Sequence, residues 1–149
     1  MTLGLTKFEC GNCGNTFDAP DAQEYGVFIL RSKGTGEPAV LHALNDPVYE
    51  EVDRLLRSLG AYGGTDELGQ AETLQRAFGV ACDLAGDGTC YEIGAMPSCP
   101  VCQARVMASW EPTGKPLPPS SSLQVVTHNR WALLAEGDKL GLILRSLKK

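Results

Sequence analysis

Two Cys-x-x-Cys pairs stand out because their residue type and spacing suit metal binding. The first is Cys10-Gly-Asn-Cys13 and the second is Cys99-Pro-Val-Cys102. A two-residue gap lets both sulfurs of a pair turn toward one ion while the intervening backbone amides point at them. Two such knuckles supply four thiolates, the tetrahedral ligand set of a structural zinc ion. We therefore predict one structural zinc per chain, bound by Cys10, Cys13, Cys99 and Cys102.

Strand-like segments flank both pairs. Residues 3–9 precede the first pair, and Thr16 begins a second strand candidate after it. Residues 105–110 follow the second pair and alternate polar with apolar side chains, as a half-buried strand does. This succession of strand, knuckle and strand resembles a zinc ribbon over residues 1–20 and 93–111. The resemblance implies a metal-stabilised module but no particular role, because zinc ribbons serve transcription, translation, enzymes and scaffolds alike.

Paired cysteines also have uses other than zinc binding. Cys-Pro-x-Cys is one knuckle of the rubredoxin family, which binds iron, although Gln103 stands where that family has glycine. Unmetallated thiols are a further alternative. A thioredoxin-like redox pair fits less well, because neither pair lies between a strand and the start of an obvious helix. Disulfides are disfavoured because no apolar segment preceded by positive charge opens the sequence, which favours a reducing cytoplasmic location.

Composition narrows the class of protein. At 149 residues with 43% hydrophobic side chains, the chain has the size of one globular domain. The formal net charge of −5 argues against binding nucleic acid, which needs a clustered positive surface. No apolar run is long enough to span a bilayer, so we expect no membrane partner.

The ribbon halves are separated by an inserted α/β region, residues 21–92, where a simple zinc ribbon has only a short hairpin. Apolar, β-rich stretches at residues 25–30 and 39–44 flank a glycine-containing turn and predict a β-hairpin. Two helices should follow. The first begins at Asp46 as N-cap with Pro47 in its first turn, and it ends at Gly60.

Apolar side chains at helical spacing indicate how these helices pack. In the first helix they are Val48, Val52, Leu55, Leu56 and Leu59. The second helix begins near Thr65 and Asp66 and ends at Gly79, and its expected core residues are Leu68, Ala71, Leu74 and Phe78.

The segment from Cys82 to Cys90 has two interpretations. Asp83 and Asp87 are reminiscent of a calcium loop, but Ala85 and Gly94 occupy positions that should carry ligands, so we reject calcium. Cys82 and Cys90 lie too far apart in sequence for a knuckle. We expect both to pack as small buried side chains, with a redox-sensitive disulfide or a second metal position as alternatives.

The last part of the chain begins with a connector rich in proline and serine, residues 112–122. Residues 123–149 should form a short strand at 123–126 and a helical segment. The final helix carries Leu140, Ile143, Leu144 and Leu147 on one narrow apolar face. This face packs on the chain's own core, on another protein, or on a second copy in a homodimer.

Catalysis has little support in the sequence. His42 and His128 have no sequence neighbour that marks them as bases or ligands, and four cysteines close the coordination shell that a catalytic zinc needs open. We therefore predict an α+β protein in which zinc-ribbon-like hairpins carry an inserted β-hairpin with two helices and a C-terminal helical segment. We expect no enzyme activity.

The favoured function is a zinc-stabilised cytoplasmic module that binds another protein, as an adaptor or as an acidic inhibitor of the immunity-protein type. The alternatives are a zinc-ribbon accessory factor of transcription or translation, and a rubredoxin-like redox protein.

Overall fold

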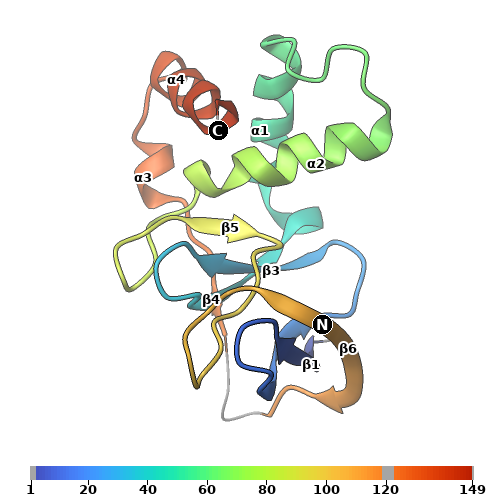
Figure 1. Cartoon of the computed structure of the whole chain (residues 1–149). Coiled ribbons are helices and arrows are strands. Elements are labelled where there is room, and N and C mark those ends of the chain that lie inside the picture. The colour runs from blue at the N-terminus through green and yellow to red at the C-terminus, as the bar shows by residue number, and fades with distance from the viewer. Residues whose placement is uncertain (1–2, 119–122, 149) are drawn as a thin grey trace.

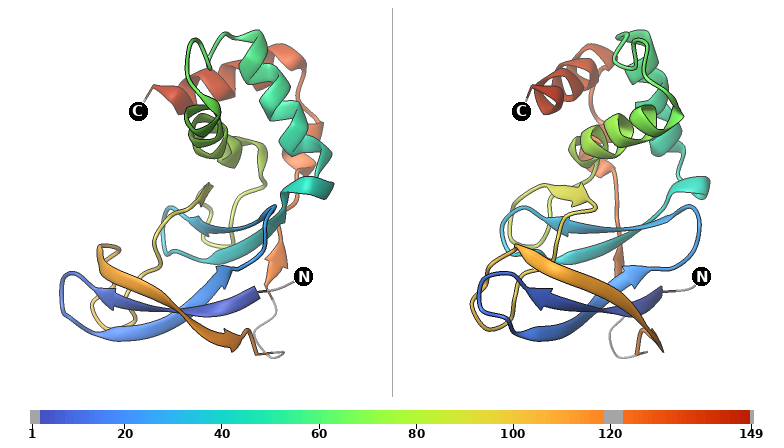
Figure 2. Two further views of the ribbon diagram at one scale, coloured as in Figure 1. Left: turned by 90° about the vertical axis from the view of Figure 1, so that its right-hand side faces the viewer. Right: turned by 45° about the vertical axis from the view of Figure 1, so that its right-hand side comes forward.

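The computed structural model describes residues 3–118 and 123–148 and shows a mixed α+β chain arranged in three layers (Figure 1). A helical layer covers one face of a four-stranded sheet, and a three-stranded sheet lies against the opposite side of that sheet (Figure 2). The predicted α+β class is confirmed.

The strands of the described chain are β1 (Leu3–Cys10), β2 (Thr16–Ala22), β3 (Val27–Ser32), β4 (Pro38–His42), β5 (Tyr91–Ile93), β6 (Met107–Pro116) and β7 (Gln124–Val125). The helices are α1 (Pro47–Ser58), α2 (Glu67–Phe78), α3 (Asn129–Ala132) and α4 (Glu136–Leu147), with single 3-10 turns η1 (Ala43–Asn45) and η2 (Gly79–Ala81).

The three-stranded sheet has the order β2-β1-β6 and is antiparallel throughout. It confirms the strands that were expected before and after the first cysteine pair and after the second. Both bounds of β6 differ from the expected 105–110: the strand begins at Met107 and continues to Pro116, whereas a connector was expected from residue 112. Pro112 and Pro116 are tolerated because β6 is an edge strand, in which a missing N–H need not break the sheet. Residues 119–122 of the expected connector lie outside the described residues.

The four-stranded sheet has the order β5-β3-β4-β7, with β7 parallel to β4 and the other pairs antiparallel. It contains the predicted hairpin, formed by β3 and β4. Alternate residues of this hairpin face opposite layers: Leu30 and Leu41 join the core under the helices, whereas Ile29 and Val40 face the three-stranded sheet. Because both faces of these strands are buried, their sequences contain unbroken runs of apolar residues.

Helix α1 follows the predicted capping pattern. The Asp46 carboxylate accepts a hydrogen bond from the backbone N–H of Val48 at 2.9 Å, and Pro47 occupies the first helical position. The apolar stripe is confirmed in its central part, where Val52, Leu55 and Leu56 are buried.

Helix α2 also begins where the sequence predicts it, with the Asp66 carboxylate accepting from the Gly69 N–H at 2.8 Å. The assignment of Leu68 to the core is wrong, because its side chain is 70% exposed. At about 100° per residue, Leu68 lies about 120° around the helix from the buried Leu74. Ala77, which the sequence pattern missed, is completely buried instead.

Helix α4 packs against α2 and η2 of its own chain. Ile143 is completely buried in the core under the helices, Leu140 and Leu147 pack against that core, and Leu144 remains 44% exposed. The apolar face thus contacts the chain's own core. Homodimerisation through this helix stays a prediction. No helix in the described part of the chain is both long and apolar enough to cross a bilayer.

Candidate metal centre

The four predicted ligands come together although the two pairs are far apart in sequence. All four Sγ atoms lie within 4.8 Å of one another. The closest distances join the pairs: 3.5 Å between Cys10 and Cys102, and 3.6 Å between Cys13 and Cys99. A tetrahedral ion with metal–sulfur bonds of about 2.3 Å separates its sulfurs by about 3.8 Å, whereas a disulfide needs about 2.05 Å. The spacing therefore suits four sulfurs around one metal ion.

Sheet pairing places the two knuckles beside each other. Cys10 is the last residue of β1, and the first knuckle forms the turn toward β2. The second knuckle lies between β5 and β6, and β6 pairs with β1 so that Met107 lies opposite Cys10. The Gly11 N–H donates to the Val106 carbonyl at 2.7 Å, which links the first knuckle directly to the chain leaving the second.

The two knuckles have the same backbone geometry. The Gly14 N–H donates to the Cys10 carbonyl at 3.0 Å, and the Gln103 N–H donates to the Cys99 carbonyl at 2.8 Å. Gly14 and Gln103, each directly after the second cysteine of its pair, both have positive φ, 78° and 65°. Gln103 therefore adopts the left-handed conformation that usually favours glycine, and the departure from glycine leaves the knuckle shape intact.

Amide groups donate hydrogen bonds to the sulfurs. The backbone N–H of Asn12 donates to Cys10 Sγ and that of Val101 donates to Cys99 Sγ, both at 3.4 Å. The side-chain amide of Asn12 crosses to Cys102 Sγ at 3.4 Å, so it contacts the opposite knuckle. These donors stabilise negative charge on the sulfurs, which is what surrounding groups do for metal ligands.

We call Cys10, Cys13, Cys99 and Cys102 the tetrad. Their sulfurs share one small volume but have different hydrogen-bond donors, so the pKa values of the thiols differ. The hydrogen bond from Asn12 lowers the pKa of Cys102 to about 6, and backbone N–H donors, Cys102 first, lower the pKa of Cys99. The Asn15 amide also favours the Cys13 thiolate, but desolvation and the other three sulfurs raise the pKa of Cys13 to about 12. Four thiolates this close repel one another unless a cation balances them, so the donor set fits a divalent, thiophilic metal.

Arg105 fixes the second knuckle to the four-stranded sheet. Its guanidinium donates to the carbonyls of Ser32 and Lys33, each at 2.8 Å, and to the Met96 carbonyl at 3.1 Å and 3.0 Å. The fork geometry of arginine allows all these bonds at once. Residue types carry no signal for this role, because every residue has a backbone carbonyl that can accept.

Arg31 lies between the two sheets and is only 4% exposed. It donates to the Ala95 carbonyl at 2.8 Å and to the Pro20 carbonyl at 2.6 Å, and its guanidinium lies 5.7 Å from the centre of the Phe8 ring. Burial lowers the pKa of Arg31 from its ordinary value. The sequence signal for this buried arginine is its place directly after the apolar run of β3.

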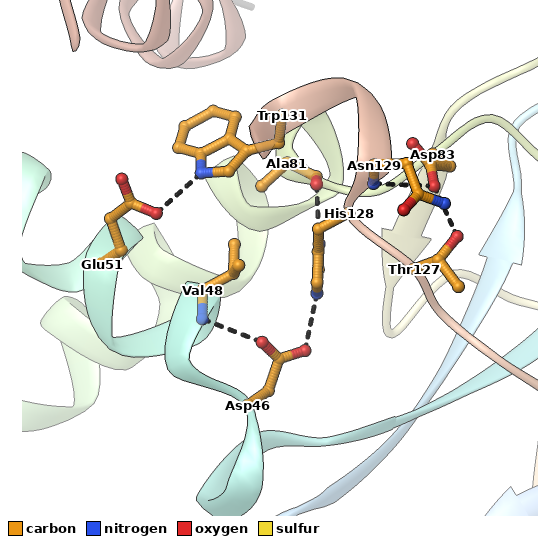
Figure 3. Close-up of polar contacts among 9 residues, drawn as sticks. All are labelled: Asp46, Val48, Glu51, Ala81, Asp83, Thr127, His128, Asn129 and Trp131. Carbon is orange, nitrogen blue, oxygen red and sulfur yellow. Dashed lines mark hydrogen bonds and ion pairs between the residues drawn. The ribbon is translucent and has the colours of Figure 1, made fainter. Parts of the chain in front are cut away.

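His128 joins the C-terminal segment to the start of α1 (Figure 3). One ring nitrogen, Nδ1, lies 2.7 Å from the Ala81 carbonyl, and the other, Nε2, lies 2.6 Å from Asp46 Oδ2. Since a carbonyl only accepts, Nδ1 donates, and Nε2 contacts a carboxylate that also caps α1. Both nitrogens are therefore engaged in holding elements together, as expected for a structural histidine. His42 lies half-buried on β4.

The segment between Cys82 and Cys90 holds loops rather than a second metal site. Cys82 is only 2% exposed, and burial raises the pKa of its thiol to about 12. Cys90 is half-buried with a free thiol. The Asp87 carboxylate accepts hydrogen bonds from the hydroxyls of Ser32, Thr35 and Thr89, which lowers its pKa.

Among residues 3–118 and 123–148, the tetrad is the only group of three or more side chains placed to hold a metal ion. Comparisons of the chain with models of protein families, with curated proteins and with solved structures find no match.

Proposed function

We propose that this chain is a zinc-stabilised module that binds another protein, as an adaptor or as an acidic inhibitor of the immunity-protein type. The observation that carries the proposal is the convergence of four cysteine sulfurs within 4.8 Å. Four protein sulfurs fill a tetrahedral shell and leave no position for a substrate, so the metal has a structural role.

The metal rigidifies a surface that exposes large apolar side chains. Val101 lies inside the second knuckle and is 69% exposed, Val106 follows that knuckle at 68%, and Trp110 on β6 is 55% exposed. Trp110 lies opposite Phe8 in the register of β1 and β6, and Phe8 in turn stacks with Phe17. Tryptophan contributes strongly at protein interfaces. We name Val101, Val106 and Trp110 the knuckle surface and propose it as the contact with the partner.

Charge supports a basic partner. The chain carries 18 acidic against 13 basic residues. An excess of negative charge accelerates association with positively charged proteins and slows association with nucleic acid. Self-association through α4 would require exchange of that helix between copies, because Ile143 is already buried within its own chain.

The metal is tested by elemental analysis and absorbance of the natively purified chain. We expect one zinc per chain and no visible colour. A red, iron-containing protein would instead support the rubredoxin-like alternative, because iron–thiolate sites absorb visible light. A metal-free protein with four titratable tetrad thiols would contradict the proposal.

The partner surface is tested with the protein that co-purifies with the full chain. Trp110→Ser and Val101→Ser should each weaken binding to that protein while zinc content stays at one per chain. Leu133→Ser is a matched control, since Leu133 is 87% exposed on the helical side of the molecule. Retention on heparin at low salt, together with unaffected binding by both knuckle variants, would favour the transcription or translation alternative.

A further inference from the structure

A cleft lies between the helical layer and the edge of the four-stranded sheet, and residues of α2, α4 and β5 line it. Figure 1 shows these three elements stacked, with the C-terminal end of α2 between α4 and β5. The cleft encloses about 240 Å³. Its lining includes the apolar residues Val80, Tyr91 and Leu142 and the cysteine Cys90.

Three cationic side chains converge on this cleft from different elements. Lys33 comes from the turn after β3, Arg76 from the last turn of α2 and Arg145 from the last turn of α4. Glu92 is the only acidic residue of the lining. Within residues 3–118 and 123–148, none of the three cations forms an ion pair, whereas Arg54 and Arg57 both pair with carboxylates. Unpaired cations collected in one cleft are unexpected in a chain whose net charge is −5.

The backbone that carries the cleft is held firmly. The Lys33 N–H donates to the Cys90 carbonyl at 2.8 Å, which fixes the β3 turn against the approach to β5. At the floor, η2 approaches β5 so closely that a Cβ atom on Gly79 would lie 2.0 Å from the Tyr91 carbonyl oxygen. Only glycine permits this contact. The packing of η2 against β5 therefore sets the position of these two elements relative to Arg76 at the end of α2.

The electrostatic balance inside the cleft is positive. The C-terminal ends of α2 and α4 each contribute about half a negative charge, which by itself disfavours an anion. Glu92 adds one more negative charge. The three cations outweigh these contributions and leave a net charge of about +1 on the residues and helix ends around the cleft. Arginine side chains match the tetrahedral oxygens of phosphate with paired N–H donors.

We propose that this cleft binds a phosphate dianion, either inorganic phosphate or the phosphoryl group of a small monoester. Lys33, Arg76 and Arg145 hold the oxygens, and Val80 and Leu142 contact the carbon part of an ester. A volume of about 240 Å³ suits a ligand of this size. None of the residues proposed to hold the anion belongs to the four-cysteine cluster or to the knuckle surface.

Calorimetric titration of the zinc-loaded full chain with phosphate at constant ionic strength tests the proposal. We expect one phosphate per chain, and at least a tenfold loss of affinity in the double variant R76Q/R145Q. K115Q is the matched control, because Lys115 is exposed on β6 and its replacement removes a charge far from the cleft. Absence of binding to the wild type, or equal binding by the double variant, overturns the proposal. Glycerol phosphate distinguishes the sources: tighter binding than phosphate identifies a monoester, and weaker binding identifies the inorganic ion.

Cys90 provides a local readout of the same site. Four of the six cysteines belong to the tetrad and Cys82 is buried. Cys90 should therefore be the thiol that iodoacetamide modifies in the zinc-loaded protein. Phosphate should slow carboxamidomethylation of Cys90 several-fold in the wild type and in K115Q, as measured by peptide mass spectrometry. Equal protection in R76Q/R145Q would place the bound anion elsewhere and overturn the assignment.

Discussion

Single side chains that act over long sequence distances organise much of this protein. Asp83 is one of them, because its carboxylate accepts from the N–H groups of Asn129 and Arg130 at 3.0 Å and 2.8 Å, and so caps α3 from a distant loop. Helix α3 has no cap from its own preceding residue, His128. A terminal donor that is left without a partner costs free energy, so Asp83 stabilises a turn it does not belong to.

The acidity of Asp83 gives a pH-dependent prediction. Partial burial raises the pKa of this carboxyl, but hydrogen bonds from Thr127, Arg130 and Asn129 outweigh burial and lower it from 3.8 to about 2. A folded pKa below the unfolded value means that the stabilisation is complete above pH 3.8 and is lost as the pH falls through 2. Asp83→Asn should therefore reduce the fall in unfolding free energy over this window, as measured by urea denaturation. Asp18→Asn, on an exposed position of β2, should leave the slope unchanged.

Cysteine substitutions separate metal ligands from ordinary core. Cys99→Ser should lose zinc, because a structural site contributes its binding energy directly to folding. Cys82→Ser should keep one zinc and cost about 1 to 3 kcal/mol, the range for placing a hydroxyl in a small buried site. Elemental analysis and denaturation of both variants check this. Loss of zinc from the Cys82 variant with retention by the Cys99 variant would show that the ligand set is wrong.

At the scale of elements, the close approach of η2 to β5 depends on one glycine. Gly79→Ala should destabilise the chain by about 1 to 3 kcal/mol, because the new methyl group must displace the Tyr91 backbone. Gly141→Ala is the matched control: it lies in α4, and no atom lies within 4 Å of its added Cβ. That variant should gain up to about 1 kcal/mol from helix propensity. Thermal denaturation of the two variants should show shifts of opposite sign, and two shifts of the same sign would refute the packing argument.

At the scale of the whole molecule, the two sheets are stabilised by different means. In the part of the chain that the structure describes, eighteen buried residues form the core between the helices and the four-stranded sheet, whereas the buried cluster on the other side consists of Val27, Ile29 and Val40. We therefore expect the three-stranded sheet to gain less from apolar burial and to depend more on the proposed metal and on Arg31 and Arg105. Closing the long loop between the knuckles costs several kcal/mol of chain entropy, which binding of the proposed ion would offset.

This difference predicts how the protein responds to metal removal. Chelation should strip hydrogen-exchange protection from the amides of β1, β2 and β6 while those of α1 and α2 keep most of theirs. Hydrogen exchange measured by mass spectrometry on the zinc-loaded and chelated chain gives the comparison. Simultaneous loss of protection in every element would show that the helical layer also depends on the ion.

Local chemistry made some features readable from the sequence alone. The clustering of the four candidate ligands was predictable because each Cys-x-x-Cys pair encodes its own knuckle. The starts of α1 and α2 were predictable because Asp46 and Asp66 cap the amides that follow them directly. Only the tertiary structure decided where β6 ends, because its prolines are tolerated solely by its place at a sheet edge.

The long-range contacts of Arg31, Asp83 and His128 were likewise decided by the fold. Their partners are carbonyls, amides and a carboxylate from distant segments, and a residue's type does not reveal which distant group it will meet. The convergence of Lys33, Arg76 and Arg145 on one cleft has the same origin, since three separate elements must pack before their charges share a surface.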